Sequence, residues 1–172
     1  MRTRFFRSGG LALLLASFCG CAGYQLGPTN GLAPREKSIQ INPFINKTLE
    51  PRLTDAVTEQ LRKEIQRDGT FRLETHDPGD IIVSGMIINY QRSAVSFQPS
   101  DTLTPLDFRL ALTAHVTARE RSSGNVILDK QVTGFTLMRV ENDLVSSERQ
   151  ALPMLAADLA KHVTALLADG TW

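Results

Sequence analysis

Two segments of the chain repeat their apolar residues with the spacing of an amphipathic α-helix. In residues 51–68 apolar side chains recur every four positions with charged residues between them, and Gly69 follows at the end. A second apolar stripe runs over residues 152–167, and Ser147 and Gln150 stand before it with the spacing of a capping box. The pattern therefore predicts two helices, each with one apolar face.

Strand-like alternation of apolar and polar residues fills most of the remaining chain after residue 37. The clearest case is 106–119, and residues 122–125 (Ser-Ser-Gly-Asn) supply a hairpin turn into the next strand. Two helices packed on one face of a mixed, largely antiparallel four-stranded sheet satisfy this order, so the predicted fold class is α+β. The segments with strand-like patterns are 38–44, 71–73, 80–91, 106–119 and 126–137.

The segment 80–91 is apolar on both of its alternating faces, as residues 81–83 (Ile-Ile-Val) and 86–88 (Met-Ile-Ile) show. A strand of this kind needs cover on both sides, but two helices on one face leave the other face open. Two interpretations remain: the second face is an exposed apolar patch for a partner, or the polar loop of residues 93–105 folds over it. In the last strand Gly134 interrupts the alternation and indicates a bulge.

The first 20 residues have the pattern of a secretory signal peptide, with three arginines before an apolar run that is too short to cross a bilayer. The run ends in Phe-Cys-Gly-Cys, which resembles the lipobox of bacterial lipoproteins, and the small Gly20 favours Cys21 over Cys19 as the lipidated residue. A disulfide between the two cysteines is disfavoured, because residues two apart rarely reach disulfide geometry. The predicted organisation is a signal peptide at 1–20, a lipidated tether at 21–37 and a single α+β domain at 38–172.

The balance of charge argues against one class of partner. The chain has 19 basic and 18 acidic residues, and loss of Arg2, Arg4 and Arg7 with the signal peptide leaves 16 against 18. A mildly acidic protein lacks the positive charge on which nucleic-acid binding depends, so no nucleic acid is expected as a partner. Ala22 directly after the lipidated cysteine indicates sorting to the outer membrane, by resemblance to other bacterial lipoproteins.

The sequence carries no recognisable catalytic or metal-binding motif. The three histidines, His76, His115 and His162, lie far apart on a predicted turn, strand and helix, and none has the spacing of a metal or nucleophile motif. Residues 46–48 (Asn-Lys-Thr) match a glycosylation sequon, but a polar turn is the simpler interpretation. We therefore expect a protein that is not an enzyme and that needs no cofactor or metal.

A group of basic residues surrounds the predicted hairpin turn. Arg119 and Arg121 flank the turn, Arg109 lies on the same strand face as Arg119, and Lys130 lies on the returning strand. Guanidinium groups bind phosphate in a bidentate manner, so Arg119, Arg121 and Lys130 are candidates for holding an anionic glycolipid head group. The alternative is an ordinary solvated strand edge.

Several motifs together resemble the LPS-assembly lipoprotein family, the lipoprotein partner of the outer-membrane LPS-transport β-barrel. The resemblance spans most of the chain after the signal peptide, although each motif is loose. The motifs are Cys-Ala-Gly-Tyr-Gln-Leu at 21–26, Pro-Phe-Ile-Asn-Lys-Thr at 43–48, Glu-Pro-Arg-Leu at 50–53, Asp-Ile-Ile-Val-Ser-Gly at 80–85 and Asp-Phe-Arg-Leu at 107–110.

This resemblance implies a function that the residues alone do not indicate. It implies a non-catalytic outer-membrane lipoprotein, anchored through lipid at Cys21, that plugs the LPS-transport β-barrel, assists its assembly and binds lipopolysaccharide during delivery to the cell surface. The family binds lipopolysaccharide through basic residues on the sheet and its loops, for which Arg119, Arg121 and Lys130 are the candidates here. The alternative function is that of an accessory lipoprotein of another envelope transport or secretion complex.

Overall fold

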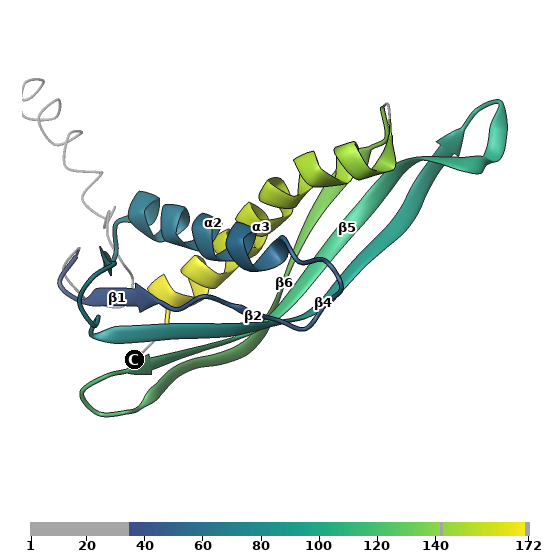
Figure 1. Cartoon of the computed structure of the whole chain (residues 1–172). Coiled ribbons are helices and arrows are strands. Elements are labelled where there is room, and N and C mark those ends of the chain that lie inside the picture. The colour runs from purple at the N-terminus through teal and green to yellow at the C-terminus, as the bar shows by residue number, and fades with distance from the viewer. Residues whose placement is uncertain (1–34, 142, 171–172) are drawn as a thin grey trace, which may run out of the picture.

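The computed structural model of the chain describes residues 35–141 and 143–170. The predicted signal peptide, most of the predicted tether and Cys21 lie outside the described residues. Eight elements follow one another along the chain (Figure 1): β1 (Ser38–Ile41), β2 (Ile45–Asn46), α2 (Leu53–Asp68), β3 (Arg72–Glu74), β4 (Ile81–Gln98), β5 (Asp101–Glu120), β6 (Val126–Arg139) and α3 (Leu144–Ala168).

The strands form one mixed sheet of six strands in the order β3-β1-β4-β5-β6, with β2 also paired to β4. The three short strands pair in parallel, β1 with β3 and β4, and β2 with β4, whereas β4, β5 and β6 are antiparallel. The predicted α+β class is confirmed, but the prediction of a four-stranded, largely antiparallel sheet is wrong. A strand as short as β2 shows no alternation, and the parallel direction arises because α2 carries the chain back across the sheet.

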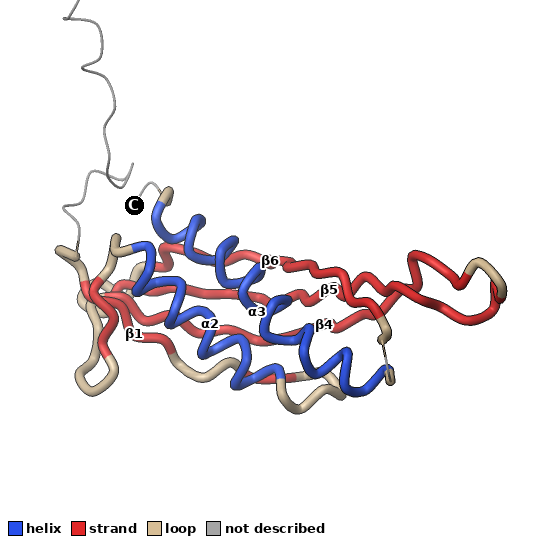
Figure 2. The backbone as a smooth tube through the Cα atoms, turned by 90° about the horizontal axis from the view of Figure 1, so that it is seen from above, coloured by secondary structure: helices blue, strands red, loops and turns tan. Residues whose placement is uncertain are grey.

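Both helices cover the same face of the sheet, side by side (Figure 2). In α2 the buried side chains include Leu53, Val57, Leu61 and Ile65, and Gly69 ends the helix with a left-handed φ of 77°. This helix agrees with its prediction. The core between helices and sheet contains mostly aliphatic side chains, together with Phe44 and Phe71, both about 2% exposed.

The second helix starts earlier than the sequence predicted. Asp143 is its N-cap and accepts a hydrogen bond from the Ser146 backbone, so Ser147 and Gln150 lie inside the first turns and do not form the capping box. By length and composition α3 is apolar enough to cross a membrane, but the core helix of a soluble protein passes the same test, and 56% of the apolar 18-residue stretch of α3 is buried inside the fold. It is the central helix of the core.

Gly134 has a different role from the predicted bulge. The β5–β6 register shifts only between Ala118 and Arg119, so β6 is regular at Gly134. A Cβ atom at Gly134 would lie 2.5 Å from the backbone nitrogen of Leu159 in α3. Glycine at this position therefore lets the backbone of α3 approach the strand directly.

The prediction of a polar loop at 93–105 is wrong. β4 and β5 continue through this segment as paired strands that turn at Pro99 and Ser100. This segment, which we call the hairpin arm (residues 93–105), projects beyond the helices (Figure 1). It does not fold over the second face of the sheet. Pairing of the two backbones continues even where no helix covers the strands, and composition alone does not reveal this.

The second face of the sheet is open but only partly apolar. On β4 the apolar residues that face away from the helices, Ile82 and Met86, are half-buried by neighbouring side chains, and polar residues occupy most other positions. Exposed apolar side chains on this face gather on β6, where Phe135 and Leu137 are 49% and 65% exposed beside Arg109. The interpretation of a continuous apolar patch therefore applies only to this small area.

Candidate functional site

The structure does not bring the three predicted basic residues together. Arg119 pairs with Ile82 and Val126 on the open face of the sheet, whereas Lys130 pairs with the buried Val116 and so lies on the helix-bearing side of the edge strand. Arg121 lies in the turn, where its backbone N–H donates to the Asp80 carbonyl at 2.8 Å. Arg119 and Arg121 are exposed neighbours at one end of the sheet, and Lys130 is separate from them.

Acidic groups share this end of the sheet with the arginines. Asp80 accepts hydrogen bonds from the backbone and hydroxyl of Ser38, at 2.9 and 2.7 Å, and these bonds lower the pKa of its carboxyl group, with a smaller contribution from Arg121. Glu120 forms an ion pair of 2.9 Å with Lys37, which lowers the pKa of Glu120. The end of the sheet therefore has mixed charge.

The three histidines remain apart and each has its own local partner. His76 contacts the Thr75 hydroxyl, His115 lies 2.6 Å from Asp129 on the open face, and His162 Nδ1 lies 3.0 Å from the Thr133 carbonyl oxygen. Over residues 35–141 and 143–170, no group of histidine, cysteine, aspartate and glutamate could hold a metal ion. Each histidine thus has a separate local contact, and the structure does not bring the three together.

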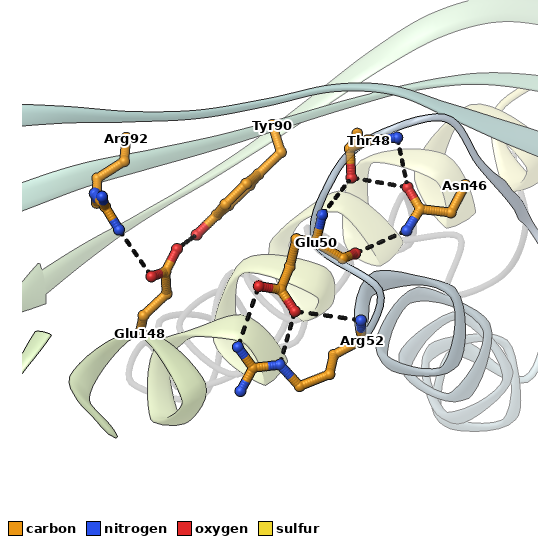
Figure 3. Close-up of polar contacts among 7 residues, drawn as sticks. All are labelled: Asn46, Thr48, Glu50, Arg52, Tyr90, Arg92 and Glu148. Atoms are coloured by element: carbon orange, nitrogen blue, oxygen red, sulfur yellow. Dashed lines mark hydrogen bonds and ion pairs between the residues drawn. The ribbon is translucent and has the colours of Figure 1, made fainter. Parts of the chain in front are cut away.

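A groove that sequence analysis did not identify lies beside β4 (Figure 3). It has a volume of about 600 Å³ and is lined by the loop of residues 47–50, by Ile88, Asn89, Tyr90 and Arg92 of β4 and by Glu148 of α3. β2 pairs with β4 only as far as Ile87, and the chain then turns away. The groove opens where this short strand ends.

Glu148 connects the first turns of α3 to the wall of the groove. Its carboxylate accepts a hydrogen bond from the Tyr90 hydroxyl and another from Arg92, the latter at 2.8 Å (Figure 3). Burial and the hydrogen bond to Glu148 raise the pKa of Tyr90 well above its ordinary value. Arg92 also lies over the Phe108 ring, 5.6 Å from its centroid. The tyrosine therefore stays protonated and acts as a structural donor.

The opposite wall is a tight polar loop. Asn46 Oδ1 accepts from the backbone and hydroxyl of Thr48, and its amide donates to the Glu50 carbonyl at 2.7 Å. The Glu50 carboxylate accepts two hydrogen bonds from the Arg52 side chain and one from its backbone N–H, and the side-chain bonds make the largest contribution to lowering the pKa of Glu50. The Asn46 amide that a sequon would offer is thus engaged in the turn, in agreement with the polar-turn interpretation.

The groove has the chemistry of a binding surface. Both of its carboxylates are paired with arginines, and the Tyr90 hydroxyl, which donates to Glu148, has a raised pKa and keeps its proton. Lys47 forms no ion pair with any residue in the described part of the chain. Sequence analysis had no signal for this groove, because Tyr90 and Glu148 are 58 residues apart and each is unremarkable in its own segment.

Comparison with known proteins shows both the family and the fold. Residues 36–167 match the model of the LptE family, described as lipopolysaccharide-assembly. No curated protein matches the sequence at a significant level. The match to the family model covers every helix and strand, apart from the last residue of α3.

Several solved structures share the fold at low sequence identity. A hypothetical protein of Chlamydia trachomatis has a TM-score of 0.58 and 10% identity, over 81% of this chain and 98% of that one. A protein of Xanthomonas campestris has a TM-score of 0.57 and 8% identity, over 84% and 90% of the two chains. A putative lipoprotein of Caulobacter crescentus has a TM-score of 0.50 and 11% identity, over 73% and 87%. The fold is shared by these proteins, and by its sequence this chain belongs to the LptE family of lipopolysaccharide-assembly proteins, a non-enzymatic lipoprotein family.

Proposed function

We propose that the mature chain is a non-catalytic, lipid-anchored subunit of the lipopolysaccharide-export translocon in the outer membrane, where it plugs the LPS-transport β-barrel, assists its assembly and binds lipopolysaccharide. The observation that carries the proposal is the family match over residues 36–167. The same fold occurs in several proteins at about 10% identity, so the fold alone would not select this function.

The described end of the tether, residues 35–37, joins the domain at one end of the sheet. Arg35 donates its backbone N–H to the Thr70 carbonyl, Lys37 accepts from the Arg72 backbone, and the Lys37 side chain binds Glu120. These contacts fix the chain at the β1 end of the sheet, opposite the hairpin arm (Figure 1). In the proposed lipoprotein, a lipid on Cys21 would be connected to the domain at this end.

A plug in a barrel lumen needs a surface that suits a polar wall. The open face of the sheet is largely polar, and rows of paired side chains such as Thr113 with Thr133 and Asp107 with Arg139 cross it. The core is closed by two helices and contains no disulfide among the described residues. A self-supporting domain with this surface supports the role of a plug.

Co-purification tests the proposed role directly. We expect the full lipoprotein, extracted in mild detergent, to be recovered in a stable complex with a large outer-membrane β-barrel, and its depletion to reduce surface lipopolysaccharide. Replacement of His76, His115 and His162 together by glutamine is expected to leave this function intact. Recovery of free lipoprotein with normal surface lipopolysaccharide would contradict the proposal, and recovery with another envelope complex would assign the chain to that system.

Lipopolysaccharide binding is proposed for Arg119 and Arg121, with Lys130 as the third predicted residue. The variant Arg119→Glu with Arg121→Glu is expected to weaken lipopolysaccharide binding without loosening the barrel complex, because both side chains are exposed. Lys130→Glu, on the other face of the sheet, tests the third candidate separately. Equal binding of lipopolysaccharide by the parent protein, the double arginine variant and the Lys130→Glu variant would mean that the hairpin is an ordinary solvated edge.

A further inference from the structure

Strand β4 has neighbours on both sides only along its first part. β1 pairs with it at Ile81–Val83 and β2 at Met86 and Ile87, and the Lys47 N–H makes the last backbone bond on that side, to the Ile87 carbonyl at 2.9 Å. Beyond Ile87, β4 pairs only with β5. Along this stretch nearly every residue from Ile88 to Gln98 is exposed, whereas Ile81, Val83 and Ile87 are buried.

The pairing pattern shows which backbone groups face this free edge. In an antiparallel ladder, alternate residues direct both N–H and C=O toward the same neighbour. Arg121 donates to Asp80 across β4–β5, and the Leu106 carbonyl accepts from Val140 across β5–β6. Along the β4–β5 register, past the bulge at Ile88, this alternation directs the N–H and C=O of Tyr90, Arg92 and Ala94 away from β5. Three consecutive donor and acceptor pairs are thus presented to the free edge.

The opposite edge of the sheet is protected in a way that this edge is not. On β6, the Phe135 N–H donates to the Asp158 carboxylate at 2.8 Å and the Thr133 carbonyl lies 3.0 Å from His162 Nδ1, so side chains of α3 take up the outward groups. No side chain in the described part of the chain forms such a bond with the outward groups of Tyr90, Arg92 or Ala94. Natural proteins usually shield exposed strand edges, since an unshielded edge recruits another strand.

The groove beside β4 lies in line with β2, which is the place that an added strand would occupy. Neighbouring strands are about 4.8 Å apart, and the groove of about 600 Å³ begins where β2 leaves β4. Its charges are compensated by the pairs Arg92–Glu148 and Glu50–Arg52, except for Lys47 at the end next to β2. A segment with an acidic residue near this end would complement the groove.

We infer that the free edge of β4 at Tyr90, Arg92 and Ala94 binds an extended segment of a protein partner as an added strand that takes up the line of β2, with an acidic residue of that segment beside Lys47. The inference rests on the proposed function for the identity of the partner, the β-barrel protein, but its geometry comes from this chain alone. The mode of recognition is strand addition, in which backbone hydrogen bonds supply affinity and flanking side chains supply specificity.

Site-specific photocrosslinking in the full lipoprotein tests this geometry. A photoreactive phenylalanine analogue at Gln91 and, separately, at Ser93 should crosslink to one segment of the barrel protein, at partner residues two positions apart, because side chains two apart share a strand face. The same analogue at the exposed Gln131, on β6 at the opposite edge of the sheet, should not reach that segment. Adducts scattered over unrelated segments, adducts with a second copy of this chain, or no adduct at Gln91 and Ser93 would overturn the inference.

A proline substitution tests the backbone contribution separately. Ala94→Pro removes an N–H that points to the free edge while the ladder to β5 keeps its bonds, and Ala94→Val keeps the N–H. Loss of one backbone hydrogen bond should lower the crosslink yield from Gln91 by about three- to tenfold in the proline variant, with little change for valine. Thermal unfolding of both variants is the control for folding. Lys47→Glu should lower the crosslink yield without any change in fold.

The outcomes separate this inference from the proposed function. A barrel complex whose crosslinks are unchanged by Ala94→Pro would overturn strand addition and leave the translocon role intact. Crosslinks in register to an extended segment of some other envelope protein would support strand addition and contradict the translocon role.

Discussion

The two long edges of the sheet differ in how their backbone groups are satisfied. At β6, Asp158 and His162 of α3 bind the outward groups of Phe135 and Thr133. At β4, pairing with β1 and β2 stops at Ile87, and the strand continues, paired only with β5, past the helices into the hairpin arm. The difference shows that a helix can close an edge as well as a core, and that β4 beyond Ile87 lacks this protection.

The largest expected effect contrasts the covered and uncovered parts of a single strand. Leu112 and Leu103 both lie on β5, but Leu112 is fully buried and Leu103 is 88% exposed. Leu112→Ala should lower the free energy of unfolding by about 2–5 kcal/mol, and Leu103→Ala by less than about 0.5 kcal/mol. Urea unfolding of the two variants measures the difference. Similar losses would mean that the arm is packed as tightly as the body.

The next effect concerns the contact between α3 and β6. Gly134→Ala places a Cβ against the Leu159 backbone, so α3 must move away from the strand. We expect a loss of about 1–3 kcal/mol in the free energy of unfolding, measured by thermal or urea denaturation. Gln131→Ala, at an exposed position on the open face of the same strand, is a suitable control. An unchanged stability would mean that the helix does not approach β6 as closely as the structure shows.

A smaller effect tests the protection of the β6 edge. Asp158→Ala removes the acceptor of the Phe135 N–H, and the bond is solvent-exposed, so the stability loss should be about 0.5–1 kcal/mol. Asp158→Asn keeps an acceptor oxygen and serves as the control. Hydrogen exchange at the Phe135 amide should become faster in the alanine variant only. If exchange were as slow as in the parent protein, α3 would not be what closes this edge.

The smallest effect is electrostatic and lies at the base of the hairpin arm. Hydrogen bonds from Arg139 and Ser96 lower the pKa of Asp107 to about 2 from an ordinary value of 3.8. Because the folded pKa is depressed, the stabilising contribution of the carboxylate is present above about pH 4 and is lost as the pH falls toward 2. Titration by NMR should show this pKa, and Arg139→Gln should raise it. At neutral pH this exposed pair is expected to add little to stability.

Sequence patterns predicted elements well where one face of a segment is buried. The stripe in residues 51–68 and the hairpin turn at 122–125 were confirmed, because each depends on local periodicity or turn chemistry. The start of α3 was misjudged, since Asp143 caps the helix ahead of its apolar stripe. The arm was taken for a loop, since its polar composition resembles one although its backbones are paired.

The candidate site was predicted less well than the fold. The basic residues were chosen by sequence proximity around a turn, and alternation on two strands placed Lys130 on the other side of the sheet from Arg119. The groove formed by Tyr90, Glu148 and the loop at 47–50 joins segments distant in the chain. Neither composition nor spacing records such long-range contacts.

The sequence by itself determined the two helices, the main hairpin strands and the resemblance to its family, because these depend on local periodicity and on motifs that are read in order. Only the tertiary structure decided the parallel pairing of the short strands, the approach of α3 to Gly134 and the free edge of β4. The first two are contacts between segments far apart in the chain. The third is a row of backbone N–H and C=O groups without a partner, and such groups leave no signature in the residues that carry them.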